Sequence, residues 1–371
     1  MPPRRNRRIP RFTLDGVPDA EITAHPLETE DGLGLRLLRF RRAPCDDAVM
    51  LVHGLTTSTD MFIMPEHRNL VTYLLDNGFT DVWCFDYRMS NRHGYNMQPH
   101  RYTMDDIALY DHPAAIDTIR KNVGPDTGLH VISHCLGAVS FSLALFGGTV
   151  TDEVTSAIVN SVSLRPRVAP WSKAKLWFAP FLVEYILGRP YVSPRWRSDP
   201  YLTRGKLISY LVSAFHSECD YPACHMLSFM WGTGYPALYS HDLIDEVTHD
   251  RGEDLYGPTA MHYHRHVRKM VGAGHRAVKY DPKDRRYDAL PDDYLDGAGD
   301  VEVPVLFCTG EENRVFMDSN ILAYETMKEK APGRHELATF AEYGHQDVFM
   351  GNTVDEDIFP TLLDFLEAHR S

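Results

Sequence analysis

The segment at residues 129–145, LHVISHCLGAVSFSLAL, restricts the fold more than any other part of the chain. Its apolar first part suits a buried strand and its second half suits a helix, with the small residues Ser133 and Gly137 around the junction. A strand that turns sharply into a helix needs small residues two positions before and after the turn, and it exposes the side chain between them. Cys135 occupies that position, so the segment predicts an α/β sheet with a reactive side chain at its edge.

Strand-like and helix-like segments alternate along most of the chain. Two short strands are predicted first, at 20–28 and 33–42. Further strands, most of them apolar and expected to be buried, are predicted at 48–54, 80–88, 128–135, 155–163, 303–313 and 334–340. Helices are predicted between them and at the end, at 65–78, 103–124, 136–148 and 357–369. This alternation predicts a mostly parallel sheet with helices on both faces.

The alternation stops for about 140 residues in the middle of the chain, and a structureless loop of that length is improbable. We therefore expect a helical cap or lid at 164–300, inserted into a core formed by 19–163 and 301–371. Sheets of this kind bind ligands at the carboxyl ends of their strands, which the cap would cover. The Trp, Phe, Leu and Tyr residues of the cap suit an apolar substrate.

The overall charge excludes some classes of partner. The formal net charge of the 371 residues is −13, which argues against nucleic acid as a main partner. Residues 1–18 begin MPPRRNRRIPR, which we interpret as a disordered basic arm. No apolar run follows the arm as in a signal peptide, and none elsewhere is long enough to span a membrane. We expect a cytoplasmic protein with reduced cysteines.

Cys135 is the candidate nucleophile. Ser133 is the alternative, but its neighbours at the same spacing, Val131 and Cys135, fit a tight turn less well. The helix that follows directs its dipole at the thiol, from which we expect a lowered Cys135 pKa. The competing interpretation of Cys135 is a buried, inert cysteine.

An acyl-transfer site also needs donors for an oxyanion and a general base. The backbone N–H of Leu136 directly follows the candidate nucleophile, and the N–H of Leu55 follows the strand that ends in His53-Gly54. We expect these two N–H groups to form the oxyanion hole. His345, after the last predicted strand and directly after Gly344, is the candidate base.

The third member of a catalytic triad orients the base, and a carboxylate usually fills this role. The loop after the strand VPVLFCTG places Asn313 at the expected position, with Glu312 beside it. An amide can orient the imidazole in a Cys-His-Asn triad. We favour Asn313, and Glu312 is the alternative.

The cap contains a second group of cysteines and histidines. Cys219 and Cys224, with His216 and His225 nearby, raise the question of a zinc site. Structural zinc sites usually combine a closely spaced pair with a second clear pair, which the sequence does not show here. We therefore expect no metal and no cofactor. Oxidation to a Cys219–Cys224 disulfide is a further alternative.

Several motifs resemble one known group of proteins. They are DVWCFDYR, LHVISHCLGA, CDYPACHMLSFMWG, GEENRVF and YGHQDVFMGNTVDEDIFP, in this order over roughly residues 20–371. The chain resembles the α/β-hydrolase superfamily, and within it the cysteine-type hydrolases fused to or accompanying glucose–methanol–choline (cholesterol-oxidase-like) oxidoreductases. More distantly it is similar to lysosomal and gastric lipases and to polyhydroxyalkanoate synthases.

The resemblance implies an α/β-hydrolase fold and ester or thioester chemistry on a lipid- or sterol-like acyl substrate. We expect a hydrolase or acyltransferase that forms an acyl thioester on Cys135. The resemblance also implies a possible oxidoreductase partner. No flavin-binding fingerprint occurs in the chain, so the chain is not itself that oxidoreductase. The alternative function is a non-catalytic protein of this fold that binds an apolar ligand or assists an oxidoreductase.

Overall fold

A computed structural model describes residues 14–55 and 57–371, so most of the predicted basic arm lies outside the described residues. Eight strands form one sheet in the order β1-β2-β4-β3-β5-β6-β9-β10. Their bounds are Glu21–Glu28 (β1), Gly34–Arg41 (β2), Asp47–Val52 (β3), Asp81–Asp86 (β4), Gly128–His134 (β5), Ser156–Asn160 (β6), Val305–Gly310 (β9) and Glu336–Phe340 (β10). Only the β1–β2 and β2–β4 pairings are antiparallel, which confirms the predicted mostly parallel sheet.

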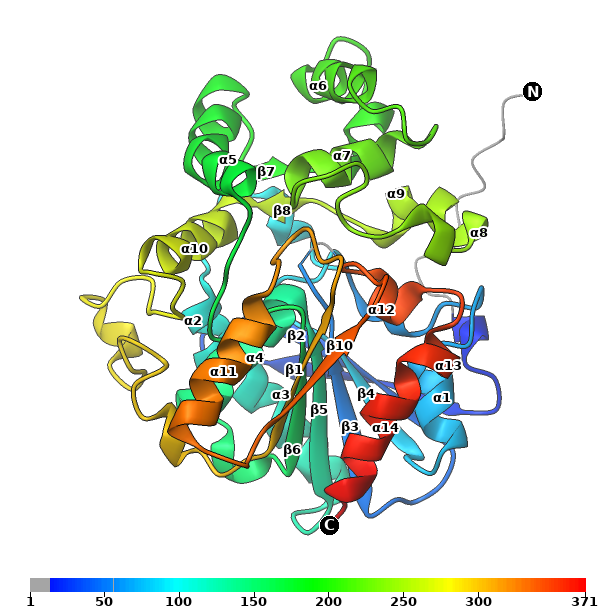
Figure 1. Ribbon diagram of the computed structural model, residues 1–371, viewed down its shortest axis with the longest axis vertical. Helices are drawn as coiled ribbons and strands as arrows, with labels where there is room; N and C mark the ends of the chain where they lie inside the picture. The colour runs from blue at the N-terminus through cyan, green and yellow to red at the C-terminus, as the bar shows by residue number, and fades with distance from the viewer. Residues whose placement is uncertain (1–13, 56) are drawn as a thin grey trace.

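The central strands are apolar because both faces of the sheet are covered. Every residue of β3, β4, β5, β6 and β9 is buried, as expected of parallel strands between two layers of helices. One layer contains α1 and α14, and the other contains α3, α4 and α11 (Figure 1). The bounds of these helices are Leu70–Asp76, Phe359–Ala368, His112–Val123, Cys135–Phe146 and Ser319–Lys330, respectively.

Side-chain caps fix where two of the core helices begin. The predicted helix at 103–124 starts with a capping box in which Thr103 and Asp106 exchange hydrogen bonds. It runs through α2 (Met104–Asp106) and a wider turn into α3. The predicted helix at 65–78 begins later, at Leu70. Asn69 accepts from the N–H of Thr72 and donates to two carbonyls outside the helix, which holds the preceding residues in a turn.

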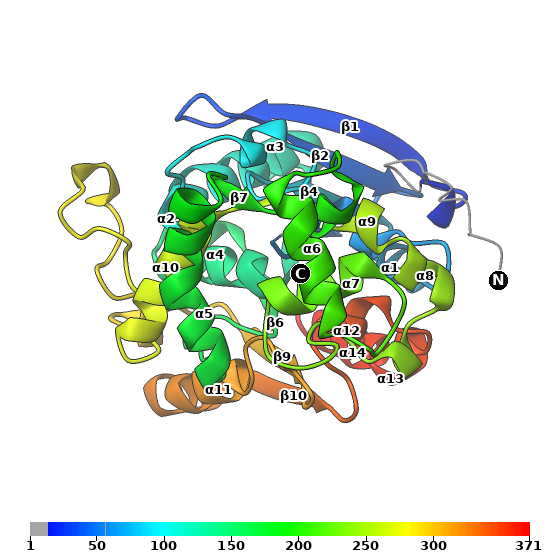
Figure 2. The same cartoon turned by 90° about the horizontal axis from the view of Figure 1, so that it is seen from above.

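The segment between β6 and β9 forms a layer over the carboxyl ends of the strands (Figures 1 and 2). Its helices are α5 (Pro170–Phe181), α6 (Arg204–Ala214), α7 (Pro222–Met230), α8 (Glu246–Asp250), α9 (Gly252–Leu255) and α10 (Met261–Gly272). A short antiparallel pair, β7 (Tyr191–Val192) and β8 (Thr259–Ala260), connects two parts of the segment that are distant in the sequence. A small apolar cluster around Trp196 and Met226 gives this layer, which we call the cap, a core of its own.

The last part of the inserted segment returns to the core. The Tyr287 and Tyr294 hydroxyls donate to Asp106 and Asp105 of α2, at 2.6 and 2.9 Å. These residues therefore pack beside the sheet and not over the ends of its strands. Among residues 14–55 and 57–371, none of the helices combines the length and the hydropathy of a membrane span.

Candidate active site

Cys135 lies at a tight turn between β5 and α4, as the sequence predicts. Its φ of +55° lies in the left-handed region, which a residue other than glycine adopts only when its surroundings impose it. A Cβ on Gly137 would lie 2.1 Å from the carbonyl oxygen of His53, and a Cβ on Gly54 would lie 2.9 Å from the Cβ of Cys135. Glycine is therefore required where α4 and the loop after β3 meet at this turn.

The predicted N–H donors reach the thiol. The backbone N–H groups of Leu55 and Leu136 both hydrogen-bond to the Cys135 thiol and lower its pKa. Burial has the larger effect, because the cysteine is only 9% exposed, and it raises the pKa of the thiol to about 12. The lowered pKa expected from the helix dipole is therefore wrong: the resting thiol is protonated because the loss of solvation outweighs the two donors.

His345 is held beside the thiol by the loop after β10. The backbone N–H groups of His345 and Gln346 both donate to the Leu238 carbonyl, at 3.1 and 2.8 Å. The Asp347 carboxylate accepts from the N–H of Gly344, which fixes the start of the loop. The Cys135 sulfur and a nitrogen of the His345 ring lie within 4.8 Å of each other. This separation places the base close to the nucleophile.

Asn313 occupies the third position. Its Oδ1 lies 3.2 Å from Nδ1 of His345. The Glu312 side chain is 60% exposed and faces Arg314, so the alternative third residue does not reach the histidine in this structure. The Asn313 amide is oriented by its other partners: Oδ1 accepts from the N–H groups of Val315 and Phe316, both at 3.1 Å.

Ser161 is a site residue that the sequence analysis missed. Its hydroxyl lies 2.7 Å from Nδ1 of His345 and accepts from Nδ2 of Asn313 at 2.8 Å. It directly follows β6 with a φ of +79°. No motif marks this serine, although its position just after a strand next to β5 is a signal that topology could have given.

The protonation of His345 follows from these contacts. Burial, followed by the nearby His134, lowers the pKa of His345 well below its usual value, so the ring is neutral. It can take the thiol proton on Nε2 only when its own proton is on Nδ1, where Ser161 and Asn313 offer oxygen acceptors. The raised pKa of the thiol and the lowered pKa of the imidazole therefore favour a neutral resting pair over a preformed thiolate–imidazolium pair.

A second buried histidine supports the first. The His134 ring centroid lies 4.8 Å from that of His345. Its Nδ1 accepts from Nδ2 of Asn160 at 2.9 Å, so its Nε2 donates to Oε1 of Gln346 at 3.1 Å. Burial lowers the pKa of His134 to about 3. With both nitrogens engaged, His134 positions Gln346 and is not free to bind a metal together with Cys135 and His345.

The pocket beside the thiol is small. Its volume of about 10 Å³ leaves room for roughly one water molecule. It is lined by Leu55, Cys135, Trp231, Leu238, Tyr256, Val315, His345 and Gln346. Trp231, Leu238 and Tyr256 belong to the cap, so an acyl group reaches the sulfur only after these side chains move.

Comparisons with known proteins place the chain in a family. The model of the alpha/beta hydrolase family matches residues 49–289. A probable lipase of Schizosaccharomyces pombe is 22% identical, over 94% of this chain and 77% of its own. Triacylglycerol lipase 1 of Arabidopsis thaliana is 23% identical, over 93% and 87%.

Among solved structures, the Pyrococcus furiosus esterase Pf2001 superposes with a TM-score of 0.52 at 15% identity, covering 95% of this chain and 92% of its own. DcsB, in complex with its substrate analogue, superposes with a TM-score of 0.56 at 11% identity, covering 94% and 100%. These likenesses confirm the predicted fold class. Together with the family match, they show that the chain belongs to the alpha/beta hydrolase family.

Proposed function

We propose that this protein hydrolyses apolar, lipid-like esters through a covalent acyl thioester on Cys135. The observation that carries the proposal is the convergence of the Cys135 sulfur, the N–H groups of Leu55 and Leu136, and the His345 ring. A nucleophile, two oxyanion donors and a base in one buried place are the components that acyl transfer needs.

The reaction follows from the neutral resting pair. His345 takes the thiol proton as the sulfur attacks the ester carbonyl, and the N–H groups of Leu55 and Leu136 stabilise the oxyanion. The intermediate collapses to an acyl thioester, and His345 returns the proton to the departing alcohol. The base then takes a proton from water, which attacks the thioester and releases the carboxylic acid and the free thiol. An alcohol in place of that water would give an acyltransferase, and an acyl thioester could replace the ester as donor.

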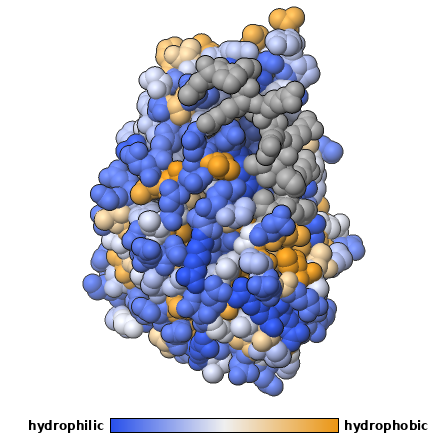
Figure 3. All heavy atoms as spheres, turned by 90° about the vertical axis from the view of Figure 1, so that its right-hand side faces the viewer, coloured by the Kyte–Doolittle hydropathy of each residue, from blue (hydrophilic) through white to orange (hydrophobic). Residues whose placement is uncertain are grey.

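An apolar substrate is supported by the surface of the cap. Large apolar side chains of α5, α6 and their flanks are exposed, and apolar side chains stand out at the top of the molecule (Figure 3). They include Trp171, Phe178, Phe181, Tyr185, Leu207, Leu211 and Phe215. Many exposed apolar side chains on two helices are typical of a surface that meets lipid or another protein. Lipases among the relatives are in accord with a lipid substrate.

Intact-mass spectrometry tests the proposal. The full chain is mixed with 4-nitrophenyl esters of increasing acyl length and with acyl thioesters, and nitrophenol release is followed in parallel. We expect an acyl-sized mass gain that is absent from Cys135→Ala and forms slowly in His345→Ala. Cys45→Ser is the matched control, because Cys45 is a free, partly exposed thiol outside the site and its loss should leave the adduct unchanged.

A specific observation also favours the alternative of a non-catalytic ligand-binding protein: the thiol is protonated and its pocket is closed. No adduct and no nitrophenol from any donor, with binding of apolar ligands retained, would favour that alternative. The association with an oxidoreductase partner, implied by the resemblance, stays a prediction.

A further inference from the structure

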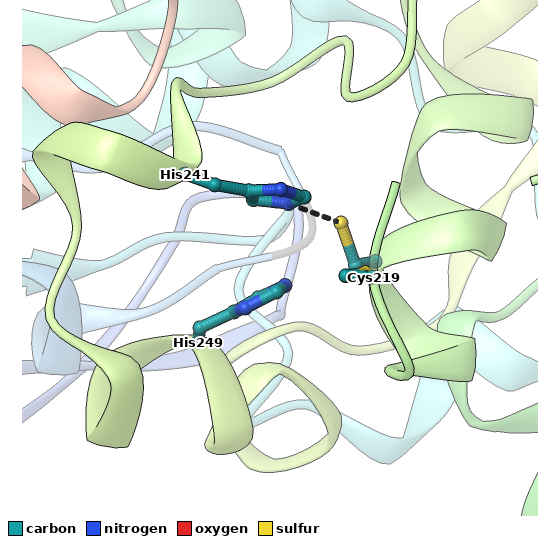
Figure 4. Close-up of side chains that lie close together, drawn as sticks. Cys219, His241 and His249 are labelled. Atoms are coloured by element: carbon teal, nitrogen blue, oxygen red, sulfur yellow. Dashed lines mark hydrogen bonds between the residues drawn. The ribbon is translucent and has the colours of Figure 1, made fainter. Parts of the chain in front are cut away.

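A second group of reactive side chains lies in the cap. Cys219 precedes α7, Cys224 lies in α7, His241 lies in a short turn after it, and His249 lies in α8. One ligand atom of each residue lies within 4.8 Å of every other. The two imidazole rings lie next to each other and face Cys219 (Figure 4). Their centroids are 4.5 Å apart.

The separations suit a small tetrahedral ion. Zinc binds thiolate sulfur at about 2.3 Å and imidazole nitrogen at about 2.0–2.1 Å, which places neighbouring ligand atoms roughly 3.3–3.8 Å apart. The Cys224 sulfur and Nε2 of His241 are 3.4 Å apart. Nε2 of His249 is buried and has no hydrogen-bond partner among the described residues. Buried polar atoms rarely lack a hydrogen-bond partner, so a buried imidazole nitrogen that lacks one and lies beside two thiols is a strong candidate for a metal ligand.

We propose that Cys219, Cys224, His241 and His249 bind one zinc ion in the cap. Two thiolates and two imidazoles favour zinc over magnesium or calcium, which prefer oxygen ligands. Two thiolates also cancel the charge of Zn²⁺, so the filled site is neutral. All four positions are taken by protein side chains, which is typical of a structural zinc and not of a catalytic one.

The fold supplies the second pair of ligands that the sequence pattern lacked. His216 and His225, the histidines nearest the cysteines in the chain, have closer hydrogen-bond partners than the two sulfurs. Nδ1 of His216 contacts Glu218 at 2.6 Å. Nδ1 and Nε2 of His225 contact Ser213 and the carbonyl of Cys219, both at 2.9 Å, and Nε2 also lies 3.5 Å from the Cys219 sulfur. His225 therefore supports the backbone of a ligand, whereas His241 and His249 reach the cysteines from further along the chain.

The zinc would stabilise the part of the cap that touches the candidate base. His241 follows Ser240, whose N–H donates to the Asp347 carboxylate at 2.9 Å. Leu238, three residues before His241, accepts from the N–H groups of His345 and Gln346. Because one ligand, His241, shares a short segment with these contacts, loss of the metal should loosen the loop that holds His345.

Metal analysis of the full chain tests the proposal. The chain is purified under reducing conditions, loaded with zinc, freed of unbound metal and measured by mass spectrometry of the elements. We expect about one zinc per chain, lost in Cys224→Ser and in His249→Gln. Cys45→Ser and His262→Gln are matched controls, a thiol outside the cap and a cap histidine outside the cluster, and both should keep the metal.

Cobalt substitution keeps the test valid if those variants fail to fold. Co²⁺ in the parent chain should give the sulfur-to-metal charge-transfer bands and the intense visible bands of a tetrahedral thiolate site. Three results would overturn the proposal: less than a tenth of an equivalent of zinc in the parent, equal zinc in Cys224→Ser and the parent, or a Cys219–Cys224 disulfide in peptide maps of the reduced preparation. Ester hydrolysis is measured separately, so an inactive chain that binds zinc would count against the proposed function alone.

Discussion

Replacing Asn313 with aspartate should speed the reaction of Cys135. The Asn313 side chain is buried, and its Oδ1 lies 3.2 Å from Nδ1 of His345. A carboxylate oxygen there keeps the hydrogen bonds from the N–H groups of Val315 and Phe316, which are both 3.1 Å away. The second carboxylate oxygen would accept from the Ser161 hydroxyl. Asn313→Asp therefore introduces a charge without leaving a backbone donor unpaired.

The size of the effect follows from the charge. A hydrogen bond to a charged group contributes about 1.5–3 kcal/mol, against about 1 kcal/mol for a neutral one. The carboxylate would stabilise the imidazolium that forms when His345 takes the thiol proton. Since about 1.4 kcal/mol changes a rate tenfold, we expect acylation to accelerate roughly 2- to 30-fold for a gain of about 0.5–2 kcal/mol.

Stopped-flow release of 4-nitrophenol and the rate of iodoacetamide alkylation at pH 7 both measure this step. Glu312→Gln is the control, because Glu312 is exposed and should leave both rates unchanged. The reasoning is refuted if Asn313→Asp leaves both rates unchanged in a folded protein, or if Glu312→Gln slows them. In the second case the loop places the glutamate beside the histidine during turnover.

Three further predictions concern the buried histidines and the site. Burial lowers the pKa of His53 to about 4 and of His134 to about 3, and it lowers the pKa of His345 well below its usual value. The unfolded chain therefore binds more protons than the folded chain at pH values just below about 6.5. The free energy of unfolding should fall as the pH drops below about 6.5, by up to about 2 kcal/mol for each histidine at pH 5. Urea unfolding at pH 5 and pH 7 measures this difference, and equal free energies at the two pH values would contradict the prediction. Ser161→Ala should slow acylation about 5-fold through loss of about 1 kcal/mol of hydrogen bonding. The nitrophenol burst measures this rate, and the melting temperature is the control for folding. Gly137→Ala should prevent folding to a soluble protein, because the new Cβ would lie 2.1 Å from the backbone carbonyl oxygen of His53. A soluble variant with a native circular dichroism spectrum would contradict this prediction.

The fold was predictable because its signals are local. A buried parallel strand is apolar along its whole length, and the tight turn at Cys135 needs small neighbours, so short stretches of sequence carry both features. The positions of His345 and Asn313 followed from where strands end. Helix 65–78 was predicted too long because the capping of Asn69 depends on carbonyls elsewhere in the fold.

The parts that were missed depend on contacts between distant residues. His134 and Gln346 hydrogen-bond across 212 positions, and Ser161 meets His345 across 184. The direction of the Cys135 pKa shift was wrong because a dipole can be inferred from one helix, whereas burial depends on the cap and the sheet together. His241 and His249 likewise reach the cysteines only through the path of the cap.

The hydrogen bonds from the His345 loop to Leu238 divide the cap into two parts with different freedom to move. Opening the pocket by lifting the whole cap would break the bonds at Leu238 and Ser240 and so displace the base that the reaction needs. We therefore expect the substrate to enter by motion of α5, α6 and Trp231, while the backbone of residues 237–241 stays with the core. The path into the site should accordingly run beneath the exposed apolar helices, and the side of the cap near α8 should stay shut throughout turnover.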